Sequence, residues 1–173
     1  MTGCAARLKA RRGARRRFPA SQAVITWPNG RIRPAAAFIQ IAKMYSTVTH
    51  DIQITVLPEF IPERSDADQA TFFWAYTVEI ANQGEKTVQL TARHWKITDG
   101  NGRLEEVQGP GVVGEQPILK PGETFRYTSG SNLSTPSGIM TGAYHMVDEN
   151  GVAFEAQIPV FSLDSPFARR VLN

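Results

Sequence analysis

The chain has 173 residues, of which 42% are hydrophobic and 20% charged, and this predicts one globular domain with an appendage. Cys4 is the only cysteine, so a disulfide framework and a cysteine-based zinc site are excluded, and a reducing, cytoplasmic location is expected. No apolar run approaches the roughly 18 residues that span a bilayer, so membrane insertion is not expected.

Charge divides the chain into two regions. Residues 1–43 hold ten basic residues and no acidic one, whereas residues 44–173 hold nine basic and all 16 acidic residues, a net charge of −7. The first region is expected to be a basic, disordered N-terminal extension, either functional or added by a start upstream of Met44. A transit peptide and a nucleic-acid-binding arm are the alternatives, although Ser21 is the only serine in this region. The acidic body is not expected to bind nucleic acid.

The body begins with two predicted strands. Residues 48–56 alternate with period two, which is typical of a half-buried strand, and Pro58 and Pro62 are expected to end it. A polar loop follows over residues 63–70. Residues 72–80 are apolar on both faces in the first half of the segment, which predicts a strand in the middle of a sheet.

A change in alternation marks the next segment. The inward positions are even-numbered over residues 86–92 and odd-numbered over residues 93–98. A β-bulge or a strand break near Ala92 would produce this change. The sequence Asp99–Gly102 reads D-G-N-G, which predicts a hairpin into a strand over residues 103–108.

Glycine and proline interrupt the stretch from Val107 to Tyr144 so often that no helix of ordinary length fits there. Turns are predicted at residues 120–123 and 148–151, and a loop over residues 132–138. The remaining segments are predicted strands, namely residues 124–129, 139–147 and 152–161. In the last of these, the alternating residues expected to share one face are Val152, Phe154, Ala156, Ile158 and Val160.

About seven to eight short strands and no amphipathic helix predict an all-β fold for residues 44–173. The alternation of polar and apolar residues indicates antiparallel sheets that each bury one face. We therefore expect an immunoglobulin- or fibronectin type III-like β-sandwich. The aromatic residues expected in its core are Trp74, Tyr76, Trp95, Phe125 and Tyr127.

The glycines Gly109, Gly111 and Gly114 match the pattern G-x-G-x-x-G. In a dinucleotide site this pattern needs a helix that opens at the last glycine, and Pro117 and Pro121 exclude one here. A P-loop is excluded because no Gly-Lys-Ser/Thr follows. The three glycines therefore predict either a turn-rich connection or a loop whose backbone amides bind an anion.

Nothing in the sequence assembles a catalytic or metal site. The three histidines, His50, His94 and His145, show no metal-ligand spacing, and no G-x-S-x-G elbow is present. We expect no catalytic residues, no metal and no cofactor.

Two runs of residues carry a resemblance to a known family. Val107–Gly130 reads V-x-G-x-G-V-V-G-x-Q-P-x-L-x-P-G-x-x-F-x-Y-x-S-G, and Thr135–Tyr144 reads T-P-x-G-x-M-x-G-x-Y. In these runs, and at Arg93–Asp99, the chain resembles the bacterial ApaG family over about residues 44–173. The resemblance implies a fibronectin type III-like sandwich, no established activity and no agreed catalytic residues.

The resemblance also implies genetic links to cobalt resistance and magnesium efflux, and use as an appended recognition domain in eukaryotic proteins. The leading hypothesis is therefore a non-enzymatic binding module for a protein partner. The alternative is a protein that binds a small anion, either pyrophosphate or a dinucleoside polyphosphate, through Gly109, Gly111 and Gly114. Cations that could support that anion are Lys96, Arg103, Lys120 and Arg126. A phosphate hydrolase is a third, less supported hypothesis, since no cluster of carboxylate ligands is visible.

Overall fold

The computed structural model of the chain describes residues 43–168, and the region expected to be a basic extension lies outside them except for Lys43. Nine strands form the described part of the chain: β1 (Tyr45–Thr49), β2 (Ile52–Phe60), β3 (Phe72–Asn82), β4 (Val88–Asp99), β5 (Leu104–Pro110), β6 (Ile118–Leu119), β7 (Thr124–Leu133), β8 (Ser137–Asp148) and β9 (Ala153–Asp164). The one helical element among the described residues is the short 3₁₀ helix η1 (Pro62–Arg64). No helix in this part of the chain is long and apolar enough to cross a membrane.

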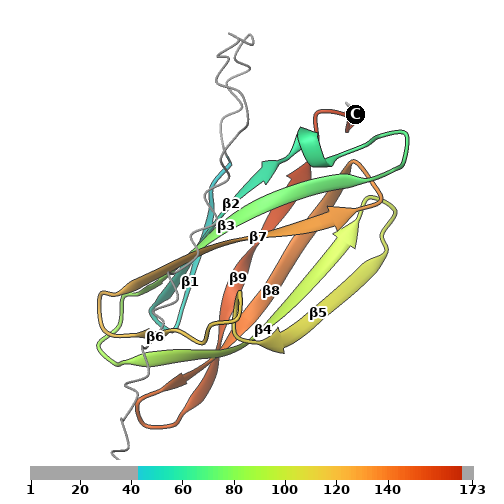
Figure 1. The fold of residues 1–173 in the computed structure, drawn as a ribbon. Helices are drawn as coiled ribbons and strands as arrows, with labels where there is room; N and C mark the ends of the chain where they lie inside the picture. The colour runs from blue at the N-terminus through green and yellow to red at the C-terminus, as the bar shows by residue number, and fades with distance from the viewer. Residues whose placement is uncertain (1–42, 169–173) are drawn as a thin grey trace, which may run out of the picture. The chain divides into compact units, whose positions relative to one another are not determined.

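The strands form two antiparallel sheets that pack face to face, which confirms the predicted all-β sandwich (Figure 1). One sheet has four strands in the order β1-β2-β3-β7. The other has five, in the order β5-β4-β8-β9, with β6 paired to β4. The predicted central position of β3 is confirmed, because β3 lies between β2 and β7. The immunoglobulin or fibronectin designation stays a prediction.

The predicted single strand over residues 48–56 is wrong, because a hairpin turn divides it into β1 and β2. His50 and Asp51 form the turn, with φ angles of 50° and 61°. Two consecutive positive φ angles match the twist of a two-residue hairpin, and short polar side chains tolerate them better than branched ones. The turn leaves Val48 exposed. Pro58 does not end β2, since β1 pairs only as far as Val56 and the missing N–H of Pro58 faces no strand on that side.

The bulge predicted near Ala92 is confirmed. The pairing of β4 with β8 shifts between Leu90 and Ala92, so Leu90 and Trp95 are both buried although their numbers differ in parity. A second irregularity was not predicted. The pairing of β8 with β9 shifts between Met140 and Gly142, which turns Val160 outward and places Phe161 in the core. The expected placement of Val160 on the same face as Ala156 and Ile158 is therefore wrong, because a bulge reverses every later side chain.

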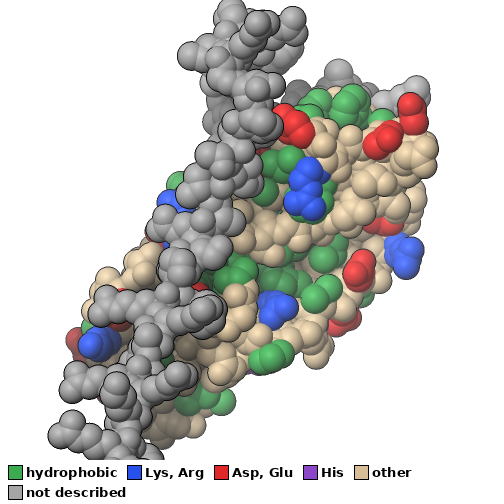
Figure 2. Space-filling model, in the orientation of Figure 1, with side chains coloured by type: hydrophobic (Ala, Val, Ile, Leu, Met, Phe, Trp, Pro, Cys, Tyr) green, Lys and Arg blue, Asp and Glu red, His purple; other side chains and the backbone are tan. Residues whose placement is uncertain are grey.

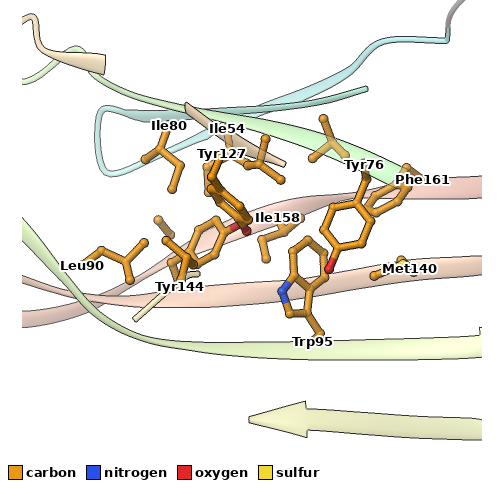
Figure 3. Close-up of a cluster of buried hydrophobic side chains, with 14 of the residues drawn as sticks. Ile54, Tyr76, Ile80, Leu90, Trp95, Tyr127, Met140, Tyr144, Ile158 and Phe161 are labelled. Atoms are coloured by element: carbon orange, nitrogen blue, oxygen red, sulfur yellow. The ribbon is translucent and has the colours of Figure 1, made fainter. Parts of the chain in front are cut away.

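The core lies between the two sheets and is rich in aromatic rings (Figure 3). Trp74, Tyr76, Trp95 and Tyr127 are buried, as predicted, and Phe125 is partly buried against them. The hydroxyls of Tyr127 on β7 and Tyr144 on β8 lie 2.5 Å apart and form a hydrogen bond across the core. Burial raises the pKa of both tyrosines, and the neighbouring Tyr127 raises that of Tyr144 further.

Candidate functional site

The glycine pattern folds as the end of β5 followed by a tight hairpin. Gly109 lies in β5 opposite Arg93, and Gly111 has a φ of 57°. Val112 is buried in the core, and Val113 and Gly114 form the exposed tip with φ angles of 45° and 82°. The three predicted site residues therefore lie in one short segment, but in three different backbone environments.

Most amides of this segment are already used. The Gly111 amide donates to the Thr91 carbonyl at 2.9 Å, and the amides of Val112 and Glu115 donate to each other's carbonyls at 2.8 Å. Among the described residues, the amides of Val113 and Gly114 are the ones at this tip without a hydrogen-bond partner. Two adjacent donors are thus available to an anion.

Arg93 fixes the base of the hairpin from the inside. Its guanidinium Nη1 donates to the carbonyls of Pro110 at 3.0 Å and Gly111 at 2.7 Å. A side chain on Gly109 would meet this guanidinium, since an added Cβ would lie 3.3 Å from Nη1. The glycine at position 109 therefore makes room for Arg93, and Arg93 binds the loop's own carbonyl oxygens.

The structure does not gather the four cations that were considered as anion ligands. Lys96 lies on the outer face of β4, and Arg126 lies on the outer face of β7 in the other sheet. Arg103 follows the β4–β5 turn, and Lys120 lies in the turn before β7. Within residues 43–168, none of the four forms an ion pair. They are exposed charges spread over separate surfaces.

Two of the three histidines, His94 and His145, lie beside carboxylates of neighbouring strands, a feature that their sequence spacing did not reveal. His94 Nε2 lies 2.6 Å from Glu106 Oε2, and His145 Nδ1 lies 3.5 Å from Glu155 Oε1. His50 lies in the first turn, not in a strand, and its ring packs edge-on against Phe154. The described residues contain no group of three or more potential metal ligands.

Two concave regions lie at different places on the sandwich. Three turns form a solvent-open cleft of about 1030 Å³, with His50, Gln83, Lys86 and Asp148 among its lining residues. Within this cleft, hydrogen bonds from the Val152 amide and then from the Lys86 ammonium lower the pKa of Asp148. The Asp148 carboxylate in this cleft is therefore engaged in hydrogen bonds that stabilise the turn to Val152.

The second concave region is a pocket of about 200 Å³ between the two sheets. It lies where the end of β7 faces the start of β5, and the residues that line it are Ile97, Asp99, Arg103, Glu105, Asn132, Leu133 and Ser134. Ile97 and Leu133 supply its apolar surface. The pocket is open on the lateral side of the sandwich where β7 and β5 are the edge strands.

We call this lateral side the open side. The outer edge of β7 runs for ten residues, and no described segment forms a backbone hydrogen bond with it. Figure 2 shows hydrophobic side chains exposed on the surface between the positions of β7 and β5. The open side thus combines unpaired backbone groups, apolar surface and a pocket.

Sequence reasoning missed the open side. The available signal was the uncharged run Tyr127–Leu133, which contains no proline or lysine to protect an edge. That signal becomes meaningful only when the strand order is known, because the same run in a central strand would be unremarkable.

Comparisons with known proteins identify the family. The family model described as the ApaG domain matches residues 62–148. Protein ApaG of Methylocella silvestris is 92% identical over 130 residues, which cover 75% of this chain and 100% of the relative. The chain belongs to the ApaG family.

More distant members of the family support the same conclusion. Protein ApaG of Bradyrhizobium diazoefficiens is 61% identical over 130 residues, again 75% of this chain and 100% of the relative. The crystal structure of the ApaA protein of Bordetella pertussis is similar with a TM-score of 0.66 and 52% identity, covering 68% of this chain and 96% of that one. The sandwich described above is therefore the fold of an experimentally determined relative.

Proposed function

We propose that this ApaG-family protein is a non-enzymatic module that binds a protein partner through its open side, in the cytoplasm. The observation that carries the proposal is the outer edge of β7, which pairs with no described strand and is uncharged from Tyr127 to Leu133. Natural sheets protect such edges with charges, prolines, bulges or short strands, because an exposed edge pairs readily with another chain. An edge whose seven residues from Tyr127 to Leu133 carry no charge and no proline is expected to have a partner. Any effect on cobalt or magnesium homeostasis would then act through that partner.

The other edge strands carry the protection that β7 lacks. β5 contains Glu105, Glu106 and Pro110, and β1 is five residues long. β9 contains Pro159 and a bulge, and its Gln157 amide donates to Thr49 of β1. The contrast within one molecule supports a binding role for β7 in particular.

Affinity purification from the native cell tests this proposal, with the tagged wild type compared with Ser131→Lys. Ser131 is half-buried and shares the inward face of Tyr127 and Leu133, so a lysine there places a charge against the open side. Ser46→Lys, on the exposed face of β1, is the matched control. We expect a reproducible partner with wild type and Ser46→Lys that is lost with Ser131→Lys. Recovery of the same proteins with all three would contradict binding at the open side.

Small-anion binding at the hairpin tip is the second candidate, and the free amides of Val113 and Gly114 favour it. Two adjacent N–H groups can bind one phosphate oxygen without a helix. An NMR titration with pyrophosphate and diadenosine tetraphosphate, with and without magnesium, tests this candidate. Saturable shifts confined to Val113 and Gly114 are expected if an anion binds there, and their absence at millimolar ligand would contradict it.

A further inference from the structure

We infer that the partner presents an extended segment that joins β7 as an added antiparallel strand, with an acidic residue beside Arg126 and a large apolar residue in the pocket beside Leu133. This inference rests on the proposed function and specifies the chemistry of the partner.

The backbone of β7 determines the conformation of the partner. β7 already pairs with β3 along its inner edge, from Phe72 opposite Leu133 to Ala81 opposite Thr124. On the outer edge, alternate residues of an antiparallel strand present both N–H and C=O to the free side. A helix uses its backbone N–H and C=O groups internally, whereas an extended segment can form hydrogen bonds with the N–H and C=O groups along the outer edge of β7. Antiparallel pairing is the more stable arrangement per residue.

The pocket determines one side chain of that segment. Its volume of about 200 Å³ exceeds the roughly 150 Å³ of a cavity that accommodates benzene. Ile97 and Leu133 form its apolar base, and its lining carries two carboxylates, of Asp99 and Glu105, against the one guanidinium of Arg103. The net negative charge of the lining disfavours an anion, and the apolar base favours an apolar side chain. A phenylalanine, leucine or methionine is therefore expected there.

Charge complementarity determines a second side chain. Arg126 is the only charged residue in β7, and it is exposed on the outer face. Glu79 lies directly opposite on β3, but within the described residues no carboxylate forms an ion pair with Arg126. An added strand would place a residue on the other side of Arg126, at cross-strand distance. An acidic residue at that position would pair with the guanidinium.

The spacing of these two features defines a sequence pattern. Arg126 and Leu133 are seven positions apart, and they lie on opposite faces because successive side chains alternate. In an antiparallel segment the apolar residue therefore comes first and the acidic residue follows seven positions later. A segment with the reverse order would fit only a parallel strand.

A synthetic ten-residue peptide of alternating threonine and valine tests the pattern, with phenylalanine at its second position and glutamate at its ninth. Fluorescence anisotropy of the labelled peptide against the full chain measures its affinity. We expect saturable binding that weakens by about tenfold or more when phenylalanine becomes alanine, because the pocket is then empty. The same composition with a central proline should not bind, since proline lacks the donor needed for pairing. No saturable binding at millimolar concentration would overturn the inference.

A reciprocal exchange of charges locates the peptide on the protein. Arg126→Glu should weaken binding about two- to fivefold, and a peptide with lysine in place of glutamate should restore it. Lys96→Glu, on the outer face of the other sheet, is the control and should leave both affinities unchanged. Because Arg126 is exposed, the variant is expected to fold, and its circular dichroism spectrum checks this. Equal binding of both peptides to wild type and Arg126→Glu would overturn the assignment to β7.

The two proposals can fail separately. If the native partner depends on Ser131 but the peptide does not bind, the protein-binding function stands and strand addition is wrong. If the peptide binds as described but no native partner depends on Ser131, the edge accepts a strand and the biological role proposed above is wrong.

Discussion

The sandwich has two lateral sides, and on each of them a hydrogen bond between two side-chain hydroxyls connects the two sheets. On the first side, Tyr45 of β1 bonds to Ser162 of β9 at 2.8 Å, and its ring packs 6.1 Å from that of Phe161. On the open side, the bond between Tyr127 and Tyr144 lies deep in the core, behind the edge of β7. The connection on the first side is partly buried near the surface, whereas the connection on the open side is buried in the core.

This difference explains how β7 can keep a free edge and remain ordered. Its inner edge pairs with β3 along ten residues, and Tyr127 connects it to the opposite sheet. No segment among residues 43–168 forms a backbone hydrogen bond with its outer edge. An edge strand can therefore be ordered by a buried hydrogen bond to the opposite sheet, without contacts along its outer edge.

Gly111→Val should have the largest effect on the open side. An added Cβ would lie 2.2 Å from the Glu115 carbonyl oxygen, and the φ of 57° is strained for a branched residue. We expect a loss of about 3 kcal/mol or more in the free energy of unfolding, because the hairpin backbone must move. Urea denaturation measures this.

The control for Gly111→Val is Gly114→Ala, where nothing lies within 4 Å of the added Cβ and only the φ of 82° is unfavourable. It should cost about 1 kcal/mol. Equal losses in the two variants would contradict the steric explanation. Gly111→Val is unsuited to testing anion binding at Val113 and Gly114, because it is expected to move the backbone of this hairpin.

Alkaline pH should weaken the interior contact of the open side. The pKa values of Tyr127 and Tyr144 are raised in the folded protein, whereas an unfolded tyrosine ionises near pH 10. Their contribution to stability is complete below about pH 10 and is lost as the pH rises further. Denaturation at pH 8 and pH 11 should show this loss, and the double variant Tyr127→Phe/Tyr144→Phe should show less of it. An unchanged pH dependence in the double variant would contradict the assignment to this pair.

Tyr45→Phe tests the rim of the first side. The variant removes one partly buried hydrogen bond to Ser162 and keeps the ring against Phe161. We expect a loss of about 0.5–1.5 kcal/mol in the free energy of unfolding. Faster hydrogen exchange should be confined to β1 and the facing part of β9, and an equal increase throughout β7 would contradict the view that the two sides are held independently.

Arg126→Glu should have the smallest effect on stability. The side chain is exposed and forms no ion pair within the described residues, but the new glutamate would lie opposite Glu79 on β3, so the loss should be about 0.5–1 kcal/mol. The main effect of Arg126→Glu should be weaker binding of the glutamate-containing peptide. A loss of more than about 2 kcal/mol would show that Arg126 supports the fold, and would contradict its assignment to a partner.

The sequence predicted the fold well where the evidence was local. The D-G-N-G turn at Asp99–Gly102, the bulge near Ala92 and the polar alternation of the strands all depend on neighbouring residues. The turn at His50 and Asp51 was missed because the pair contains no glycine or asparagine, and the alternation continued across it. The outward position of Val160 was missed although Pro159 lies beside it in the bulge, because a proline in a strand is equally compatible with a regular edge position.

The candidate site was less accessible to prediction. The three glycines define one short segment in the sequence, but which amides of this segment are unpaired depends on the bonds of Gly111 to Thr91 and of Val112 to Glu115. The open side depends on strand order, which brings Leu133 close to Ile97 in the pocket although they are far apart in the chain. Such long-range neighbours are set by topology, and period-two patterns do not encode topology.

Amide hydrogen exchange along β7, resolved by NMR, tests the central claim most directly. We expect a period-two pattern from Thr124 to Leu133, in which amides bonded to β3 are protected and those on the outer edge exchange quickly. Addition of the phenylalanine- and glutamate-containing peptide should protect the fast amides and remove the alternation. Uniform protection of β7 in the free protein would show that its outer edge is already paired, and would contradict the account.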